Sequence, residues 1–166
     1  MIVPLTLADF LERADLVYGH REAVVDEPDP PGGGLGRFTY AQFASMSRSL
    51  AAALDDLGVA ENDRVAIVSP NAARFLVSLF GVSVFGRVLV PVNFRLNAEE
   101  IRYVIEHSGS SVLLVDPELD EGLRGITVKH RFVLGRGTDP QLFLRPEAKP
   151  RLRVTEENAT VSINYT

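Results

Sequence analysis

Short apolar stretches alternate with helix-forming stretches along most of this chain, and this alternation limits the possible folds more than any other feature. Apolar runs occupy residues 64–69, 88–93 and 111–117, and stretches with helical periodicity occupy residues 72–85 and 97–107 between them. A continuous apolar run is typical of a strand covered on both faces of a parallel sheet. Parallel neighbours are joined by crossover helices. We therefore predict an α/β fold with a mostly parallel sheet flanked by helices.

Residues that begin and end helices support this interpretation. Thr39 with Gln42, and Asn97 with Glu100, have the spacing of a capping box, in which two side chains bond each other's backbone N–H groups. Thr6 is a good N-cap with an acidic residue, Asp9, in the first turn. Glycines that can stop helices follow at three points, namely Gly58, Gly86 and Gly109. Shorter elements are predicted near residues 118–123, a helical stretch, and 131–134, a strand.

Residues 28–36 are too rich in Pro and Gly to form a regular element. Their glycines lack the G-x-G-x-x-G spacing of a dinucleotide-binding loop, because Arg37 or Thr39 stands where the third glycine should fall. We therefore predict a flexible surface hairpin loop. The missing spacing also argues against a small nucleotide-binding module of the Rossmann type, an alternative that measurable binding of ATP or NAD would revive.

Composition and charge exclude several functional classes. The formal net charge of −5 argues against nucleic acid as a partner, because phosphate backbones are held by clustered Lys and Arg. The basic residues between 124 and 153 are interpreted as a solvated surface, with a site for an anionic partner as the alternative. The chain has no Cys, which rules out disulfides and thiolate metal sites and fits a cytoplasmic protein. Polar residues interrupt the longest apolar stretch, residues 75–92, and no secretory signal is visible, so we expect a soluble protein with no transmembrane segment.

No group of residues has the spacing of a catalytic or metal-binding site. His20, His107 and His130 are too dispersed for a helix-spaced metal pair. Ser83 lies in GVSVFG, which misses the G-x-S-x-G nucleophile motif by one position. We therefore predict no catalytic residue and no metal ligand within this chain.

The C-terminal residues indicate that the chain is the front part of a longer protein. Residues 160–166 alternate apolar and polar side chains, as in a half-buried strand, and no turn, cap or polar tail follows them. We expect Val161, Ile163 and Tyr165 to lie on surface exposed by truncation and to promote self-association. Residues 1–166 would form a single α/β subdomain, in which residues 139–153, with their scattered prolines, are linker-like.

Three stretches resemble the opening core motifs of the adenylate-forming superfamily, which includes acyl-CoA synthetases. RFTYAQF at residues 37–43 resembles the first motif, and residues 84–116 are similar to the second motif and the segment after it. INYT at residues 163–166 resembles the lead-in to a Ser/Thr/Gly-rich loop that wraps ATP phosphates. Peptide-synthetase domains usually carry an acidic residue where Asn93 stands, so the fatty-acid–CoA ligase branch is the better match.

This resemblance implies a parent enzyme of fatty acid metabolism that uses ATP, Mg²⁺ and coenzyme A to activate a carboxylic acid. It implies that Thr166 lies near the ATP phosphates and that Arg95 contacts a phosphate of coenzyme A. The alternative is that neither residue binds a ligand, so that Thr166 is a strand-end threonine and Arg95 a surface arginine. The chain stops before the rest of the phosphate loop, so the fragment is expected to be inactive and to bind none of these cofactors. The identity of the acid stays open, as does a stand-alone, non-catalytic α/β interaction module as the alternative.

Overall fold

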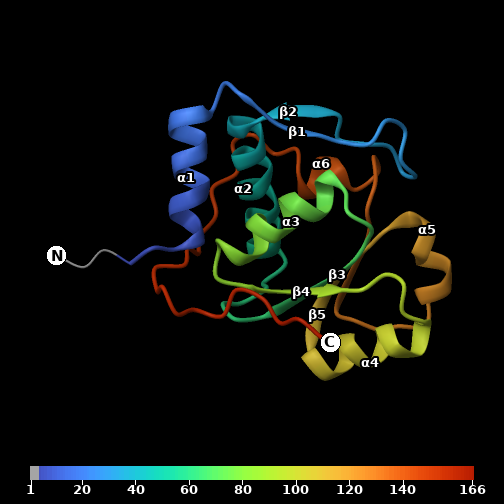
Figure 1. Ribbon diagram of the computed structural model, residues 1–166. Coiled ribbons are helices and arrows are strands. Elements are labelled where there is room, and N and C mark those ends of the chain that lie inside the picture. Colours follow the sequence, from blue (N-terminus) through green and yellow to red (C-terminus); the bar gives the residue numbers. More distant parts are fainter. Residues whose placement is uncertain (1–3) are drawn as a thin grey trace.

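The computed structural model describes residues 4–166, which form a parallel sheet with helices on both faces and a separate two-stranded ribbon (Figure 1). In chain order the elements are α1 (Leu7–Tyr18), β1 (Glu22–Val25), β2 (Arg37–Thr39), α2 (Tyr40–Asp56), β3 (Arg64–Val68), α3 (Ala73–Ser83), β4 (Val88–Val92), α4 (Ala98–Ser108), β5 (Ser110–Val115), α5 (Pro117–Asp120), the 3₁₀ turn η1 (Glu121–Leu123), β6 (His130–Val133) and α6 (Asp139–Leu142). The predicted α/β class is confirmed.

The main sheet has the strand order β4-β3-β5-β6, and every pair in it is parallel. The chain passes from β3 to β4 on one side and then crosses back to place β5 on the other side of β3. The winding direction therefore reverses between β3 and β5. In sheets of this kind, such a reversal opens a crevice at the carboxyl ends of the strands.

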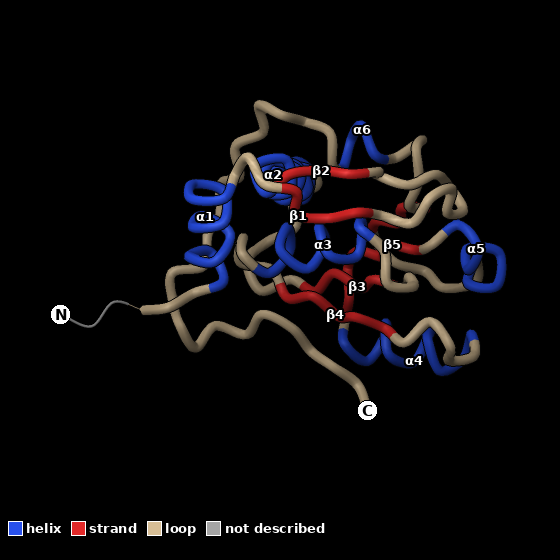
Figure 2. Tube along the Cα trace, turned by 45° about the horizontal axis from the view of Figure 1, so that its top comes forward, coloured by secondary structure: helices blue, strands red, loops and turns tan. Residues whose placement is uncertain are grey.

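Both faces of the sheet are buried, and β3 shows why its sequence is apolar throughout. Val65 and Ile67 face one core cluster, which also contains residues of α1, α2 and α3. Ala66 and Val68 face the other cluster, which contains residues of α4 and η1. Alternate side chains of a strand point to opposite faces. Figure 2 shows α4 on the opposite side of the sheet from α2 and α3.

The predicted helix caps are present. Thr39 accepts a hydrogen bond from the Gln42 backbone N–H, and Asn97 accepts from the N–H groups of Glu99 and Glu100 at 3.0 Å. Helix α4 ends at Gly109, whose φ of 63° is left-handed, a conformation that glycine adopts without strain. Local sequence therefore sets the start of α2 and both ends of α4.

The C-terminal segment departs from the prediction, because residues 160–166 form one isolated bridge to β4 and not a strand. Leu89 donates its N–H to the Val161 carbonyl and accepts from the Ile163 N–H, at 3.1 and 2.9 Å. The next donor that a parallel ladder would need on β4 is residue 91, which is a proline and has no N–H. Pro91 therefore explains why the ladder stops after one rung.

Residues 139–153 are more integrated than the linker-like expectation implies. They begin with α6, and Leu142 and Phe143 are fully buried. The Asp139 carboxylate forms a buried, two-bonded ion pair with Arg74 of α3, at 2.7 and 2.6 Å. This pair joins segments 65 positions apart in the chain.

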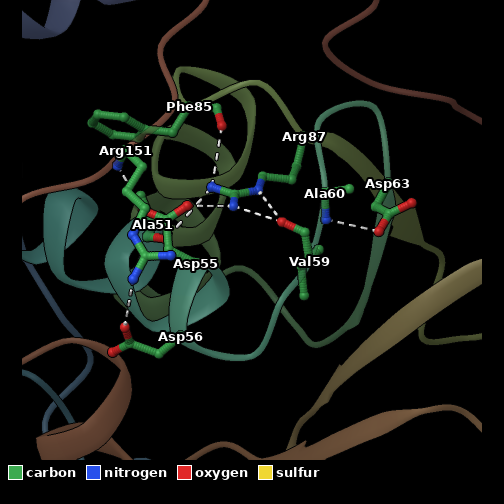
Figure 3. A network of polar contacts seen from close by, with 9 residues as sticks. All are labelled: Ala51, Asp55, Asp56, Val59, Ala60, Asp63, Phe85, Arg87 and Arg151. Carbon is green, nitrogen blue, oxygen red and sulfur yellow. Dashed lines mark hydrogen bonds and ion pairs between the residues drawn. The ribbon is translucent and has the colours of Figure 1, made fainter.

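A second buried ion pair lies where α2 meets the start of β4 (Figure 3). The Arg87 guanidinium donates to the Asp55 carboxylate at 2.6 Å, and the two side chains are 1% and 4% exposed. Its other N–H groups donate to backbone carbonyls, those of Ala51, Val59 and Phe85. Asp55 also accepts from the backbone N–H of Arg151 at 2.6 Å. Protein groups thus satisfy both charges, as buried charges require.

Candidate functional site

The carboxyl edge of the parallel sheet is the candidate site, since open α/β sheets bind ligands there. Four segments leave this edge, formed by residues 69–72 after β3, residues 93–97 after β4, residue 116 after β5 and residues 134–138 after β6. The reversal between β3 and β5 places the first and third loops side by side, and the Asp116 N–H donates to the Val68 carbonyl at 2.9 Å.

The loop after β4 presents an exposed cation. The Asn93 side chain accepts the backbone N–H of Arg95 at 3.0 Å, which closes a tight turn before the Asn97 cap. Arg95 is exposed, and its guanidinium carbon lies 5.4 Å from the centre of the Phe94 ring. No ion pair holds Arg95 within residues 4–166. Its donors are free for an anion, and Phe94 restricts where they point.

A small cavity of about 200 Å³ lies beside this loop, between it and α5 with η1. Its apolar wall is formed by Phe94, Leu96, Ile101, Leu119 and Leu123. Asp116 does not reach into the cavity, because its carboxylate caps α5 by accepting from the Glu118 N–H at 3.0 Å. The loop after β4 therefore combines an exposed cation with an adjoining apolar recess.

The loop after β3 borders a larger cavity of about 680 Å³ between β1 and α3, but its positive helix end is already occupied. Helix α3 begins after Ala72, which has no side-chain cap. The Asp26 carboxylate takes that place by accepting from the Ala73 N–H at 3.0 Å and from the Leu35 N–H at 2.8 Å. A carboxylate at a helix N-terminus neutralises the partial charge that would attract an anion. Sequence reasoning missed Asp26, although a long helix starting at an alanine signals a cap from elsewhere.

Thr166 lies at the exposed end of the C-terminal segment, and Figures 1 and 2 place this end beside α4. The preceding Tyr165 hydroxyl forms a hydrogen bond with Nδ1 of His107, in the last turn of α4, at 2.8 Å. Arg95 precedes the first turn of the same helix. Within residues 4–166 no hydrogen bond joins Thr166 to Arg95, the two predicted ligand-binding residues.

Ser83 and His107, which were also considered from the sequence, have packing roles. Ser83 donates its hydroxyl to the Val161 carbonyl at 2.8 Å and so helps to hold the C-terminal segment. His107 stacks on Tyr103 with ring centres 5.3 Å apart. The described residues, 4–166, include no cluster of three or more His, Cys, Asp or Glu arranged to hold a metal ion. Over the same residues, no helix is long and apolar enough to cross a membrane.

Known proteins resemble this chain in sequence. A long-chain-fatty-acid–CoA ligase of Thermus thermophilus is 40% identical over 148 residues, which cover 86% of this chain and 27% of that ligase. 4-Hydroxybutyrate–CoA ligase 2 of Metallosphaera sedula is 39% identical over 68% of this chain and 19% of its own length. The chain thus spans about a quarter or less of these curated relatives.

Solved structures resemble it in fold. The N-terminal domain of FACL13 from Mycobacterium tuberculosis superposes with a TM-score of 0.82 and 27% identity, covering 98% of this chain and 42% of that one. A long-chain-fatty-acid–CoA ligase from Archaeoglobus fulgidus, FadD1, shares the fold with a TM-score of 0.85 at 20% identity, over all of this chain and 35% of its own. Residues 11–166 match the AMP-binding enzyme family. This chain therefore belongs to the AMP-binding enzymes.

Proposed function

We propose that this chain is the N-terminal part of an ATP-dependent acyl-CoA synthetase of the fatty-acid–CoA ligase type. The observation that carries the proposal is the 40% identity to the Thermus ligase over 86% of the chain. In the proposed reaction, a carboxylate oxygen attacks the α-phosphorus of ATP, which gives acyl-AMP and pyrophosphate. The coenzyme A thiol then loses its proton and attacks the acyl carbon, giving the thioester and AMP. ATP, Mg²⁺ and coenzyme A belong to the longer protein in this proposal.

The proposal assigns Arg95 to a phosphate of coenzyme A. An exposed guanidinium that is steered by Phe94 and has no carboxylate partner among residues 4–166 suits a phosphate oxygen pair. It assigns the Thr166 hydroxyl to the ATP phosphates. A single exposed hydroxyl is a weak site for a polyanion, so within this proposal Thr166 acts with residues that follow it, and the chain alone binds no cofactor.

The chain alone is proposed to be inactive, in the cytoplasm and prone to self-association. Ile163 and Tyr165 are half-buried against α4 and β4, which leaves part of each side chain exposed. Sedimentation velocity over a range of concentrations tests this point: a sedimentation coefficient that rises with concentration supports self-association, and a constant monomer value rejects it.

Pyrophosphate exchange tests the main proposal. A polypeptide that continues past Thr166 along the reading frame should exchange labelled pyrophosphate into ATP with fatty acids and form thioesters when coenzyme A is added. The 166-residue chain should do neither. If the longer polypeptide is folded but gives no exchange with any carboxylic acid, the synthetase proposal is wrong and the non-catalytic interaction module takes its place. Turnover by the short chain would contradict its proposed inactivity.

A further inference from the structure

A groove of about 520 Å³ separates the β2–α2 corner from α6, on the side of the molecule away from Arg95's loop on β4. This volume lies within the range of about 300–1,000 Å³ that small-molecule sites occupy. The deepest lining side chains are apolar and almost fully buried, namely Phe38, Met46 and Phe143. A hydrocarbon ligand could bury its surface there without leaving a polar protein group unpaired.

The charges around this groove are almost all positive. Its lining includes three arginines, Arg37, Arg136 and Arg145, and one carboxylate, Asp139. Asp139 is neutralised by its buried ion pair with Arg74. The groove therefore offers an unbalanced positive charge above an apolar floor.

Only one of the three arginines keeps its charge unpaired within residues 4–166. Glu22 binds Arg37 at 2.8 Å, and Asp56 binds Arg145 at 2.8 Å. Arg136 is exposed, and no carboxylate of the described residues lies within ion-pair distance of it. Arg136 is thus the cation that is free to receive an anionic group.

The Pro/Gly loop that joins β1 to β2 holds Arg136 in place. The Arg136 backbone N–H donates to the Gly32 carbonyl at 3.0 Å. Its side chain lies across Gly33, where an added Cβ would stand 2.3 Å from Nε. Gly33 also has a φ of 77°, so a side chain at this position would be strained as well as obstructed. The loop between β1 and β2 lacks the spacing of a nucleotide-binding motif, but it positions the guanidinium of Arg136.

We propose that this groove binds a medium-chain carboxylate, with its carboxylate on Arg136 and its hydrocarbon chain along Phe38, Met46 and Phe143. A guanidinium pairs with a carboxylate through two parallel hydrogen bonds. A polyphosphate fits less well, because one unpaired cation and an apolar floor leave most of its oxygens unsatisfied. The inference goes beyond the proposed synthetase function and does not use Arg95 or Thr166, so either can fail without the other.

Methionine-methyl NMR tests the proposal directly on the 166-residue chain, because Met46 is the one methionine within the described residues, 4–166. Decanoate should shift the Met46 methyl signal saturably. Decanol lacks the charge, so its affinity should be lower than that of decanoate by about tenfold or more. Arg136→Gln should weaken decanoate binding about tenfold. The matched control is Arg124→Gln, which removes an exposed arginine whose carboxylate partner Asp120 lies 3.8 Å away, and it should leave binding unchanged.

A charge swap keeps the test decisive. Arg136→Glu should lose decanoate binding and gain binding of decylammonium, which shows that the groove is still folded. The proposal is overturned if decanoate gives no saturable shift of Met46, if decanol binds as tightly as decanoate, or if Arg136→Gln behaves like Arg124→Gln. Failure of Arg136→Glu to bind decylammonium while its methyl spectrum stays native-like also counts against it.

Discussion

Two arginines flank strand β4, and their surroundings give them opposite roles. Arg87 directly precedes the strand; its side chain is 1% exposed, and its donors go to Asp55 and to backbone carbonyls. Arg95 follows the strand on the carboxyl edge; its side chain is exposed, lies over the Phe94 ring and forms no ion pair within residues 4–166. Burial therefore distinguishes two regions of this fold. One is the frame, by which we mean the buried sheet and helices with their ion pairs, and the other is the exposed carboxyl edge, where a ligand could bind. A buried arginine has no donor left for a ligand, and an exposed one contributes little to stability.

The largest expected effect comes from removing the buried cation. Arg87→Met should lower the free energy of unfolding by about 3–5 kcal/mol, because it leaves the Asp55 carboxylate buried without its partner. Urea denaturation measures the change. The double variant Arg87→Met with Asp55→Leu should recover most of the loss, since both charges are then gone. A loss well under 1 kcal/mol in the single variant, on the scale of a surface substitution, would mean that Arg87 is not part of the frame.

Close packing inside the frame should give the next largest effect. A Cβ added at Gly81 would lie 2.9 Å from the Ser47 carbonyl oxygen and 3.0 Å from the Leu50 side chain, where α3 crosses α2. Gly81→Ala should therefore cost about 1–3 kcal/mol. Gly122, beside the carboxyl edge, has no atom within 4 Å of an added Cβ, so Gly122→Ala is the control and should change stability by less than about 0.5 kcal/mol. Equal effects would erase the distinction between the two regions.

Arg95→Ala tests the exposed arginine of this comparison. It should change the free energy of unfolding by less than about 0.5 kcal/mol, because Arg95 is exposed and has no carboxylate partner in residues 4–166. In the longer polypeptide it should raise the KM for coenzyme A about tenfold and leave pyrophosphate exchange unchanged, because only the second step uses coenzyme A. Arg102→Ala, an exposed arginine on α4, is the matched control. Loss of pyrophosphate exchange in Arg95→Ala would reject the assignment.

The smallest expected effect is electrostatic and lies on the surface. A hydrogen bond from Arg37, at 2.8 Å, lowers the pKa of Glu22 below its ordinary value of 4.5. A depressed pKa in the folded state adds stability above the ordinary value, and this contribution is lost as pH falls through the folded pKa. Urea midpoints of the wild type and Glu22→Gln should therefore differ slightly at neutral pH and converge at acid pH. A difference that grows on acidification would contradict this sign.

Local pattern predicted the frame well and the long-range polar contacts poorly. The strands and helix caps depend on neighbouring residues, as in β3 or the Asn97 cap, and sequence reasoning identified them. Arg87 looked like an interruption of an apolar stretch, because its partner Asp55 is 32 positions away. Asp26 and Ala73 are separated by 47 positions. No local pattern reports such pairings.

The candidate site was predicted only in part, for a related reason. Arg95 was singled out by resemblance, and the structure adds its exposure and its contact with Phe94. The strand expected at residues 160–166 does not form, because its neighbour β4 contains Pro91, which has no N–H to donate. Sequence reasoning interpreted Arg136 as one of many solvated basic residues. The residues that position it, Gly32 and Gly33, lie about a hundred positions earlier in the chain.

Native-state amide hydrogen exchange at increasing urea tests the division between frame and edge most directly. The amides of α2, β3 and β5 should exchange only through global unfolding, with free energies of opening that fall steeply as urea rises. Those in the loops at residues 69–72 and 93–97 should exchange through local openings that urea barely affects, apart from the Arg95 and Asn97 amides, which donate to the Asn93 and Glu100 side chains. If the amides of β3 exchange as readily as the loop amides and with the same flat dependence on urea, the buried ion pairs do not maintain a rigid frame.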